Sequence, residues 1–277
     1  MAEIFRRECR LRREDRRRAD VSVAELFHEN TKLQRVAALA NVASDNYGAR
    51  EFDAMTRAYK RYRLHPQVPL PSLPVGTVGP PFGEVIATRR SHRDFASDQL
   101  SLSQVSAILQ WSYGITGYAG MPGGGVQRFR AVPSAGALYP AEIYLGIRAV
   151  EGLEGGIYHY EVPVNSLALL GRGDPTGRLY EVCCRQEYAR QAAMVVLISG
   201  VVERTKRKYG DRGYRYVLLD IGHLGENLYL ACTALGLAMV TTCGFYDNEA
   251  ADLLGIDGCD EAVFYVAFIG RKPADEL

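Results

Sequence analysis

The sequence predicts a domain that contains both strands and a long helix. Residues 216–235 carry apolar side chains at helical spacing, and Gly236 follows where a glycine commonly ends a helix. The near-continuous apolar run 192–202 is typical of a strand that is buried on both faces. The segments 156–161 and 165–170 have the pattern of a β-hairpin. Together these features predict helices that accompany a sheet.

Composition sets broad limits on the class of protein. The chain has 277 residues, which suffices for one large domain or two small ones. Its hydrophobic content of 47% and charged content of 23% are ordinary for a soluble globular protein. A formal net charge of +1 gives no reason to expect a nucleic acid, a membrane or a polyanion as a partner.

The cysteines and histidines predict neither a disulfide framework nor a metal site. The six cysteines show no C-x-x-C spacing, and the five histidines are scattered along the chain. The sequence also shows no signal-peptide core and no apolar run of membrane length. We therefore expect a cytoplasmic protein with reduced thiols and without a metal.

The N-terminal part is expected to precede the main domain as an extension. Residues 1–20 mix arginines with acidic residues, which favours a solvated helix or a frayed tail, with an RNA- or leader-binding arm as the alternative. A helix is expected from Ser22 onward. The Pro-rich run 65–74 predicts an extended linker. We therefore divide the chain into an N-terminal extension, residues 1–79, and a domain, residues 80–277.

Local signals mark further elements. Ser101 and the glutamine three residues later form a capping-box pattern ahead of an apolar helix. Residues 143–147 and 263–269 alternate as strands, and residues 176–186 are expected to form a helix. The glycine-rich segment 121–125 is expected to be a flexible loop.

The segment T-R-R-S-H-R-D-F, residues 88–95, gathers positive charge around a hydroxyl. Its three arginines offer planar donor forks and its serine offers a hydroxyl, a donor set that suits a phosphate dianion better than a carboxylate. The alternative is a solvated basic surface, which is what most charge runs are.

A second segment, residues 128–144, joins a compact turn to a strand. Ala135, Gly136 and Ala137 present almost no side-chain bulk, so this backbone can come close to something flat. The alternative is a tight loop that simply leads into the strand.

The run P-S-A-G-A-L-Y-P followed by A-E-I-Y-L, residues 133–145, resembles the signature of the SagB-type dehydrogenases, a branch of the FMN-dependent nitroreductase superfamily. The segments R-R-S-x-R, K-Y and T-T-C-G-F also resemble family motifs, and they occur in the family's order. The resemblance covers residues 66–272. It implies an α+β fold, with a mixed central sheet wrapped by helices, in a domain-swapped homodimer that holds two FMN molecules at its interface.

The resemblance also implies most of a flavin site. In the family the P-S-A-G loop lies against the isoalloxazine ring, the R-R-S-x-R motif opens the phosphate site, and the later segment approaches the N5 edge. Cys243 departs from the two small residues, usually glycines, that the family has before the phenylalanine. The implied FMN-binding residues are Arg89, Arg90, Ser91, Arg93, Pro133, Ser134, Ala135, Gly136, Leu138, Cys243, Gly244 and Arg271.

The stretch 204–216 contains the candidate catalytic residues. Its charges alone favour a charged loop with tyrosines packed under it. Family members that oxidise azolines carry an adjacent Lys-Tyr pair here, and Lys208 and Tyr209 match that pair. A lysine can take a proton from carbon if burial or the neighbouring arginines lower its pKa. Tyr209 would polarise the ring or relay the proton.

A polar stripe runs along the long predicted helix. It consists of Asp220, His223 and Asn227. A buried, hydrogen-bonded network is the favoured interpretation, and a direct catalytic role for His223 is the alternative.

The sequence leaves three activities open. The first is a peptide-tailoring oxidase that converts azolines to thiazoles or oxazoles, with FMN as hydride acceptor, O2 as final oxidant, and a heterocyclase and a precursor peptide as partners. The second is an NAD(P)H-dependent reductase or dehydrogenase of small molecules. The third is a non-catalytic flavin-binding subunit of a biosynthetic complex. A Rossmann nucleotide site is not supported, because no G-x-G-x-x-G motif follows a strand.

Overall fold

The computed structural model describes residues 22–32, 59–73, 79–121 and 125–274, and the chain divides into two compact units at Asn46. In the first unit, helix α2 (Val23–Asn30) begins after Ser22 as expected. Its start is a capping box, because the Ser22 hydroxyl accepts the Glu25 N–H and the Glu25 carboxylate accepts the Ser22 N–H, both at 3.2 Å. The tail predicted at residues 1–20 lies outside the described residues.

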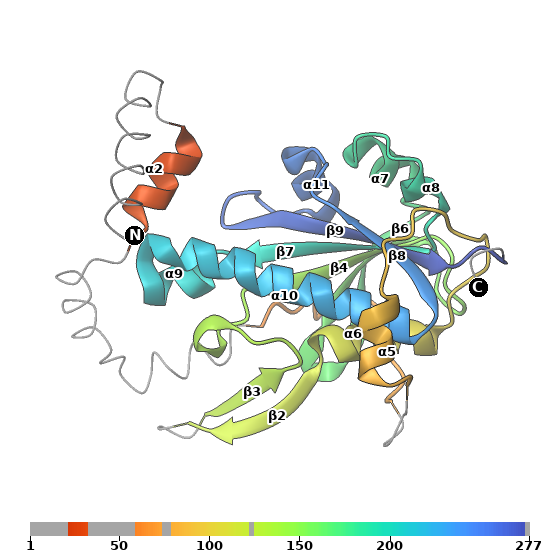
Figure 1. Ribbon diagram of the computed structural model, residues 1–277, viewed down its shortest axis with the longest axis horizontal. Helices are drawn as coiled ribbons and strands as arrows, with labels where there is room; N and C mark the ends of the chain where they lie inside the picture. The colour runs from red at the N-terminus through yellow and green to blue at the C-terminus, as the bar shows by residue number, and fades with distance from the viewer. Residues whose placement is uncertain (1–21, 33–58, 74–78, 122–124, 275–277) are drawn as a thin grey trace, which may run out of the picture. The chain divides into compact units, whose positions relative to one another are not determined.

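The second unit is built on a seven-stranded sheet with the strand order β1-β6-β5-β4-β7-β9-β8 (Figure 1). The strands are β1 (Gln67–Pro69), β4 (Ala141–Ile147), β5 (Gly156–Glu161), β6 (Ser166–Arg172), β7 (Met194–Val201), β8 (Leu237–Thr242) and β9 (Glu261–Arg271). The α+β class is confirmed. The sheet was expected to mix parallel and antiparallel strands, but every pair of neighbouring strands in it is antiparallel. Short connections join β4 to β5 and β5 to β6, and such connections suit antiparallel neighbours.

Helices cover both faces of this sheet (Figure 1). Helices α6 (Leu102–Tyr113) and α10 (Gly213–Ala234) pack on one face. Helices α7 (Thr176–Val182), α8 (Tyr188–Gln191) and α11 (Asp247–Leu254) pack on the other. The side chains of β7 alternate between the two hydrophobic clusters, so this strand is buried on both faces as its apolar run predicted.

The long predicted helix is α10, whose apolar face consists of Val217, Ile221, Leu224 and Leu228, each at most 3% exposed. Gly236 follows the helix with a φ of 68°, the left-handed conformation expected of a glycine that ends a helix. None of the helices in the described ranges is long and apolar enough to cross a membrane.

Two local predictions need correction, and one hairpin was missed. The expected helix 176–186 already ends at Val182, because Cys184 and Arg185 adopt left-handed conformations with φ values of 54° and 58°. The segment 121–125, expected to be a flexible loop, lies mostly outside the described residues. The strands on either side of it, β2 (Ile115–Gly120) and β3 (Val126–Arg130), form an antiparallel hairpin that the sequence analysis missed.

The Pro-rich run is extended, but part of it is a strand rather than a linker. Residues 67–69 pair with β6 at the edge of the sheet, where a proline leaves no ladder hydrogen bond unmade. The structure therefore places residues 59–73 in the same unit as the sheet, whereas the sequence placed them in the N-terminal extension.

Candidate functional site

The loop before β4 has an unusual backbone conformation. Gly136, Ala137 and Tyr139 all have positive φ values, of 63°, 53° and 47°. Only glycine adopts this region without cost, and each other residue held there costs about 1–3 kcal/mol. The surroundings must therefore fix the loop in place.

Asp220 of α10 holds the loop through hydrogen bonds. The Ser134 hydroxyl donates to the Asp220 carboxylate at 2.5 Å, and the backbone N–H of Ala135 donates to the same carboxylate. The Ser134 hydroxyl also accepts the Tyr139 N–H at 2.9 Å. Burial raises the pKa of Asp220, and the two hydrogen bonds oppose that rise. The loop and the middle of α10 thus form one hydrogen-bonded unit.

Lys208 and Tyr209 lie directly against this loop. They end α9 (Glu203–Tyr209), the short helix that precedes α10. A Cβ atom built on Gly136 would lie 2.8 Å from the Tyr209 hydroxyl oxygen and 3.2 Å from the Lys208 Nζ atom. The positive φ favours glycine here, and any larger residue would have to displace the ends of the Tyr209 and Lys208 side chains. The structure brings the predicted catalytic pair and the predicted flavin loop together.

The Tyr209 ring is held by a second tyrosine. Its ring packs edge-to-face on the Tyr216 ring, with the ring centres 4.9 Å apart. The Arg212 Nε–H donates to the Tyr216 hydroxyl at 3.3 Å. Tyr216 and Arg212 therefore support the position of the Tyr209 ring.

Two of the predicted phosphate residues, Arg89 and Ser91, contact Tyr229 of α10. The Arg89 guanidinium lies 5.1 Å from the centre of the Tyr229 ring, and the Ser91 and Tyr229 hydroxyls are 3.0 Å apart. Arg90 instead donates to the carbonyl groups of Ala87 and Arg89, at 3.0 and 2.7 Å.

Arg93 and Arg271 do not join Arg89 and Ser91 in these contacts. The Arg93 side chain is exposed. Arg271 donates from Nε to the Gln99 carbonyl at 3.0 Å and from Nη2 to the Gln104 side chain at 3.5 Å. A role of either arginine at a phosphate stays a prediction.

The Tyr229 hydroxyl is part of a network that the sequence analysis missed. It accepts the Thr241 N–H at 3.1 Å, and the Thr241 hydroxyl lies 2.7 Å from that of Tyr265. These three residues come from α10, β8 and β9. Thr241 opens the T-T-C-G-F motif, but that motif did not predict its contacts with Tyr229 and Tyr265. Only the placement of the strands beside α10 brings them together.

A pocket of about 330 Å³ connects Tyr229 with Cys243. Its lining residues are Leu218, Ile221, Gly222, Gly225, Glu226, Tyr229, Cys243, Phe264 and Tyr265. A Cβ atom on Gly222 would meet nothing within 4 Å, so this part of α10 is open to the pocket.

The segment that contains Cys243 and Gly244 is fixed by side chains. The Gly244 N–H donates to the Thr242 hydroxyl at 2.9 Å, and the Gly244 carbonyl accepts the Gln186 amide at 2.7 Å. The Cys243 thiol donates to the Phe264 carbonyl at 3.7 Å. Burial raises the pKa of this thiol, which does not favour its use as a nucleophile.

Two groups of predicted site residues lie on opposite sides of α10. Asp220, which holds the P-S-A-G loop, and Tyr229, which meets Arg89 and Ser91, are nine positions apart. At 100° per residue they point in directions about 180° apart, and they are separated by about 13 Å along the helix axis. A single copy of the chain therefore presents the two halves of the predicted flavin site on different faces.

The polar stripe of α10 is divided between burial and exposure. Asp220 is buried against the loop, and the Asn227 amide donates to the carbonyl groups of Ser112 and Ala131, at 3.3 Å each. His223 is exposed. The network interpretation thus holds for Asp220 and Asn227.

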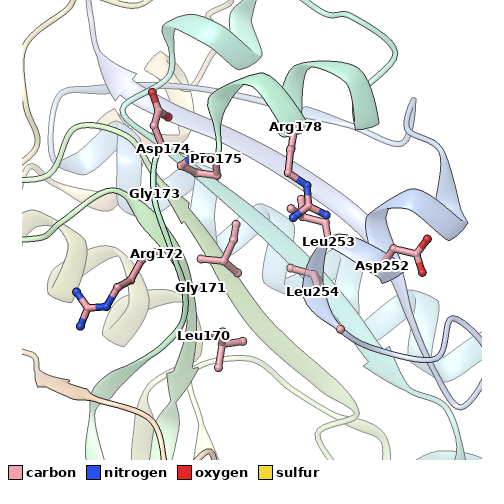
Figure 2. Close-up of a pocket in the computed structure, with 12 residues that line it drawn as sticks. Leu170, Gly171, Arg172, Gly173, Asp174, Pro175, Arg178, Asp252, Leu253 and Leu254 are labelled. Carbon is pink, nitrogen blue, oxygen red and sulfur yellow. The ribbon is translucent and has the colours of Figure 1, made fainter.

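A second pocket, of about 400 Å³, lies between the end of β6, α7 and α11 and contains none of the predicted site residues (Figure 2). Its charged lining residues are Arg172, Asp174, Arg178 and Asp252. Arg172 points away from Arg178 and Asp252 in Figure 2 and pairs with Glu154. Within the described residues no group of three His, Cys, Asp or Glu side chains could hold a metal ion.

Comparison with known proteins identifies the family. The model of the Nitroreductase family matches residues 86–271, so the chain belongs to the nitroreductase family. The predicted family is confirmed at this level. The protein is an oxidoreductase of a family whose members typically bind flavin.

Three curated relatives are similar to this chain. "Putative nitroreductase MJ1384" of Methanocaldococcus jannaschii is 40% identical over 189 residues, which cover 68% of this chain and 90% of the relative. The Trifolitoxin-processing protein TfxB of Rhizobium leguminosarum bv. trifolii is 25% identical, with 63% of this chain and 48% of the relative covered. The Microcin B17-processing protein McbC of Escherichia coli is 30% identical, with 53% and 56% covered. The chain thus spans about half the length of the two processing proteins.

A solved structure shares the fold. The crystal structure of an Anabaena variabilis protein described as a "putative nitroreductase" matches with a TM-score of 0.70 and 24% identity. The match covers 90% of this chain and 47% of that one. This likeness supports the fold.

Proposed function

We propose that this protein is an FMN-dependent oxidase of the SagB-type branch that converts azoline rings of a precursor peptide to thiazoles or oxazoles. The observation that carries the proposal is the position of Lys208 and Tyr209 against Gly136 of the P-S-A-G loop. Two relatives are processing proteins for trifolitoxin and microcin B17, which supports a peptide substrate. A heterocyclase and the precursor peptide are the partners that this reaction requires.

The residues present fit FMN. Arg89 and Ser91 offer a guanidinium and a hydroxyl beside Tyr229, a donor set that suits the phosphate dianion. The adjoining pocket runs from Tyr229 to Cys243 past an open glycine of α10. On the other side of α10, the loop around Gly136 has so little side-chain bulk that a flat ring can lie on it.

A homodimer, domain-swapped as the resemblance implies, would complete each site. Because the loop and the Arg89–Tyr229 group lie on opposite sides of α10, one flavin would contact both only if a second copy supplied one of them. Leu218 and Leu219 of α10 are 44% and 57% exposed, and a partner would cover this apolar surface.

In this reaction the protein's own residues would accept the proton and hold the loop in position. FMN, when bound, supplies a hydride acceptor, and O2 takes up the two electrons to give hydrogen peroxide. The substrate also loses a proton from carbon, and Lys208 in its neutral form would accept it. Tyr209, whose ring centre lies 5.5 Å from the Lys208 Nζ atom, would relay this proton or polarise the ring, and the Asp220–Ser134 bond holds the loop in position.

A second candidate function is an NAD(P)H-dependent reductase of small molecules. It is favoured by the 40% identity to a relative whose name is nitroreductase. The same flavin site would serve, and Lys208 would not be needed as a base.

The test is aerobic turnover of an azoline-containing model peptide by the purified FMN-loaded protein. The expected result is the loss of two mass units per ring with one equivalent of peroxide, and the abolition of both in Lys208→Ala. Azolines left unchanged beside rapid NAD(P)H oxidation would favour the reductase instead. A protein that does not bind FMN would refute both.

A further inference from the structure

Arg204 joins the helix that carries Lys208 to the loop that carries Gly136. Its Nη2 atom lies 2.5 Å from the Glu142 Oε1 atom, and its Nη1–H donates to the Tyr139 carbonyl at 3.3 Å. The Arg204 side chain is 11% exposed. One guanidinium therefore contacts both the end of the P-S-A-G loop and the start of β4.

Glu142 is itself firmly held. Its Oε2 atom lies 2.9 Å from the Nε2 atom of His159, a fully buried residue of the neighbouring strand β5. Burial opposes ionisation of Glu142, but Arg204 and His159 outweigh it and lower its pKa to about 2. Arg204 thus pairs with a buried, negatively charged carboxylate that His159 also contacts.

Helix α9 needs such an anchor because it is short. It has seven residues and no side-chain cap at its start, and it is followed by Gly210, which has a φ of 57°. A helix of this length is not stable by itself, so its tertiary contacts determine its position. Arg204 and Lys208 are four residues apart and therefore lie on the same side of α9.

We propose that Arg204 is a positioning residue, which sets the distance of Lys208 and Tyr209 from the loop around Gly136. The proposal rests on the proposed function, because Lys208 and Tyr209 are its catalytic pair. The planar fork of arginine reaches the Glu142 carboxylate and the Tyr139 carbonyl at once, whereas a lysine presents a single point charge. Position, rather than charge, is the property that Arg204 contributes.

The variant Arg204→Lys separates these two properties, because it keeps the positive charge and removes the fork. We expect kcat for azoline oxidation to fall by about 10- to 100-fold, the cost of a displaced catalytic group, with KM and FMN affinity within about twofold of the parent. The matched control is Lys206→Arg, an exchange of cations on the same helix at a residue that pairs with Glu203 and Asp211 on the surface. It should retain the parent's kcat.

A second readout follows the position of Lys208 without turnover. Mass spectrometry after brief treatment with acetic anhydride measures the acetylation rate of the Lys208 amine in each variant. We expect Arg204→Lys to change this rate at Lys208 by at least about threefold, because displacement of the amine from the loop changes its access to reagent. Glu142→Gln breaks the same contact from the other side and should reproduce both changes if Arg204→Lys does not fold.

Each outcome decides the proposal. Unchanged kcat and unchanged acetylation of Lys208 in Arg204→Lys and Glu142→Gln would overturn it. A fall in kcat that comes only with loss of bound FMN would also overturn it, because Arg204 would then be supporting the fold. If the parent does not oxidise azolines, the proposed function fails alone, and the acetylation rates still decide whether Arg204 sets the position of Lys208.

Discussion

The hydroxyl oxygen of Tyr209 lies 2.8 Å from the point that a Cβ atom on Gly136 would occupy. This relationship joins two segments that are more than seventy positions apart in sequence, and a methyl group on Gly136 would have to displace the Tyr209 hydroxyl. It makes Gly136 the position at which the smallest possible substitution tests the site.

Gly136→Ala should abolish azoline oxidation. The added methyl group would displace Tyr209 and Lys208, and the positive φ would cost about 1–2 kcal/mol of stability for an alanine. The control is Gly152→Ala, where φ is 76° and a Cβ atom would meet nothing within 4 Å. This control should lose similar stability in thermal unfolding but retain turnover. Equal activity in the two variants would contradict the close approach.

The sequence predicted the parts of the site that lie within short motifs. The P-S-A-G loop and the Lys208–Tyr209 pair are each local, so their residues could be named without knowing the fold. The network of Tyr229, Thr241 and Tyr265 could not be predicted, although Thr241 lies in the T-T-C-G-F motif, because the three residues meet only through the packing of α10 on β8 and β9. No motif predicted that the loop held by Asp220 and the group of Arg89 and Ser91 at Tyr229 lie on opposite sides of α10, because that depends on the contacts of the helix.

For the fold, too, strong local patterns were predicted and features that depend on their place in the sheet were missed. The long helix and the doubly buried strand β7 have strong periodic patterns, and both were predicted. The β2–β3 hairpin was missed because glycines and arginines interrupt its alternation. The edge strand at residues 67–69 was missed because prolines suggested a linker, although an edge position tolerates them.

Lys60→Met should destabilise the protein strongly. The Lys60 amine lies 2.5 Å from the buried Glu261 carboxylate, which also accepts hydrogen bonds from the hydroxyls of Tyr144 and Ser199. Removing Lys60 leaves this carboxylate buried without its cation, which costs about 3–5 kcal/mol. Chemical denaturation measures the loss.

The comparison for that variant is Arg172→Met, which breaks the exposed pair of Arg172 with Glu154. An exposed pair contributes about 0–1 kcal/mol, so the unfolding midpoint should hardly change. Similar losses in the two variants would show that the burial of Glu261 is not what makes Lys60 necessary.

The buried Glu142 should make stability depend on acid pH. Its pKa is about 2 in the folded protein, below its ordinary value of 4.5, despite the opposing effect of burial. A carboxyl group with a lowered pKa stabilises the fold above the ordinary value and loses that contribution as pH falls toward the lowered one. The free energy of unfolding should therefore fall between about pH 5 and pH 2. Glu142→Gln should lack this part of the decline, and an identical pH profile would contradict the assignment.

Arg89→Ala should weaken FMN binding by about 10- to 100-fold, the value of a hydrogen bond to a charged group. Arg90→Ala should weaken it less, because Arg90 is directed to the carbonyl groups of Ala87 and Arg89. Arg178→Ala, in the pocket of Figure 2 that contains none of the predicted site residues, is the control and should bind FMN like the parent. Quenching of flavin fluorescence during titration gives the three dissociation constants. Equal losses for Arg89 and Arg90 would mean that both reach the phosphate.

Arg89 and Lys208 belong to groups on opposite sides of α10, which predicts complementation between two impaired variants. Arg89→Ala should weaken FMN binding and Lys208→Ala should remove the proposed base, so turnover is assayed at an FMN concentration too low to load Arg89→Ala. If each flavin uses Arg89 of one protomer and Lys208 of its partner, a mixed dimer of the two variants contains one site with both residues intact. Unfolding and refolding an equal mixture should then restore about a quarter of the parent's turnover, because half of the dimers are mixed and each has one intact site. No restored turnover, with mixed dimers verified by native mass spectrometry, would place both residues of each site on the same chain.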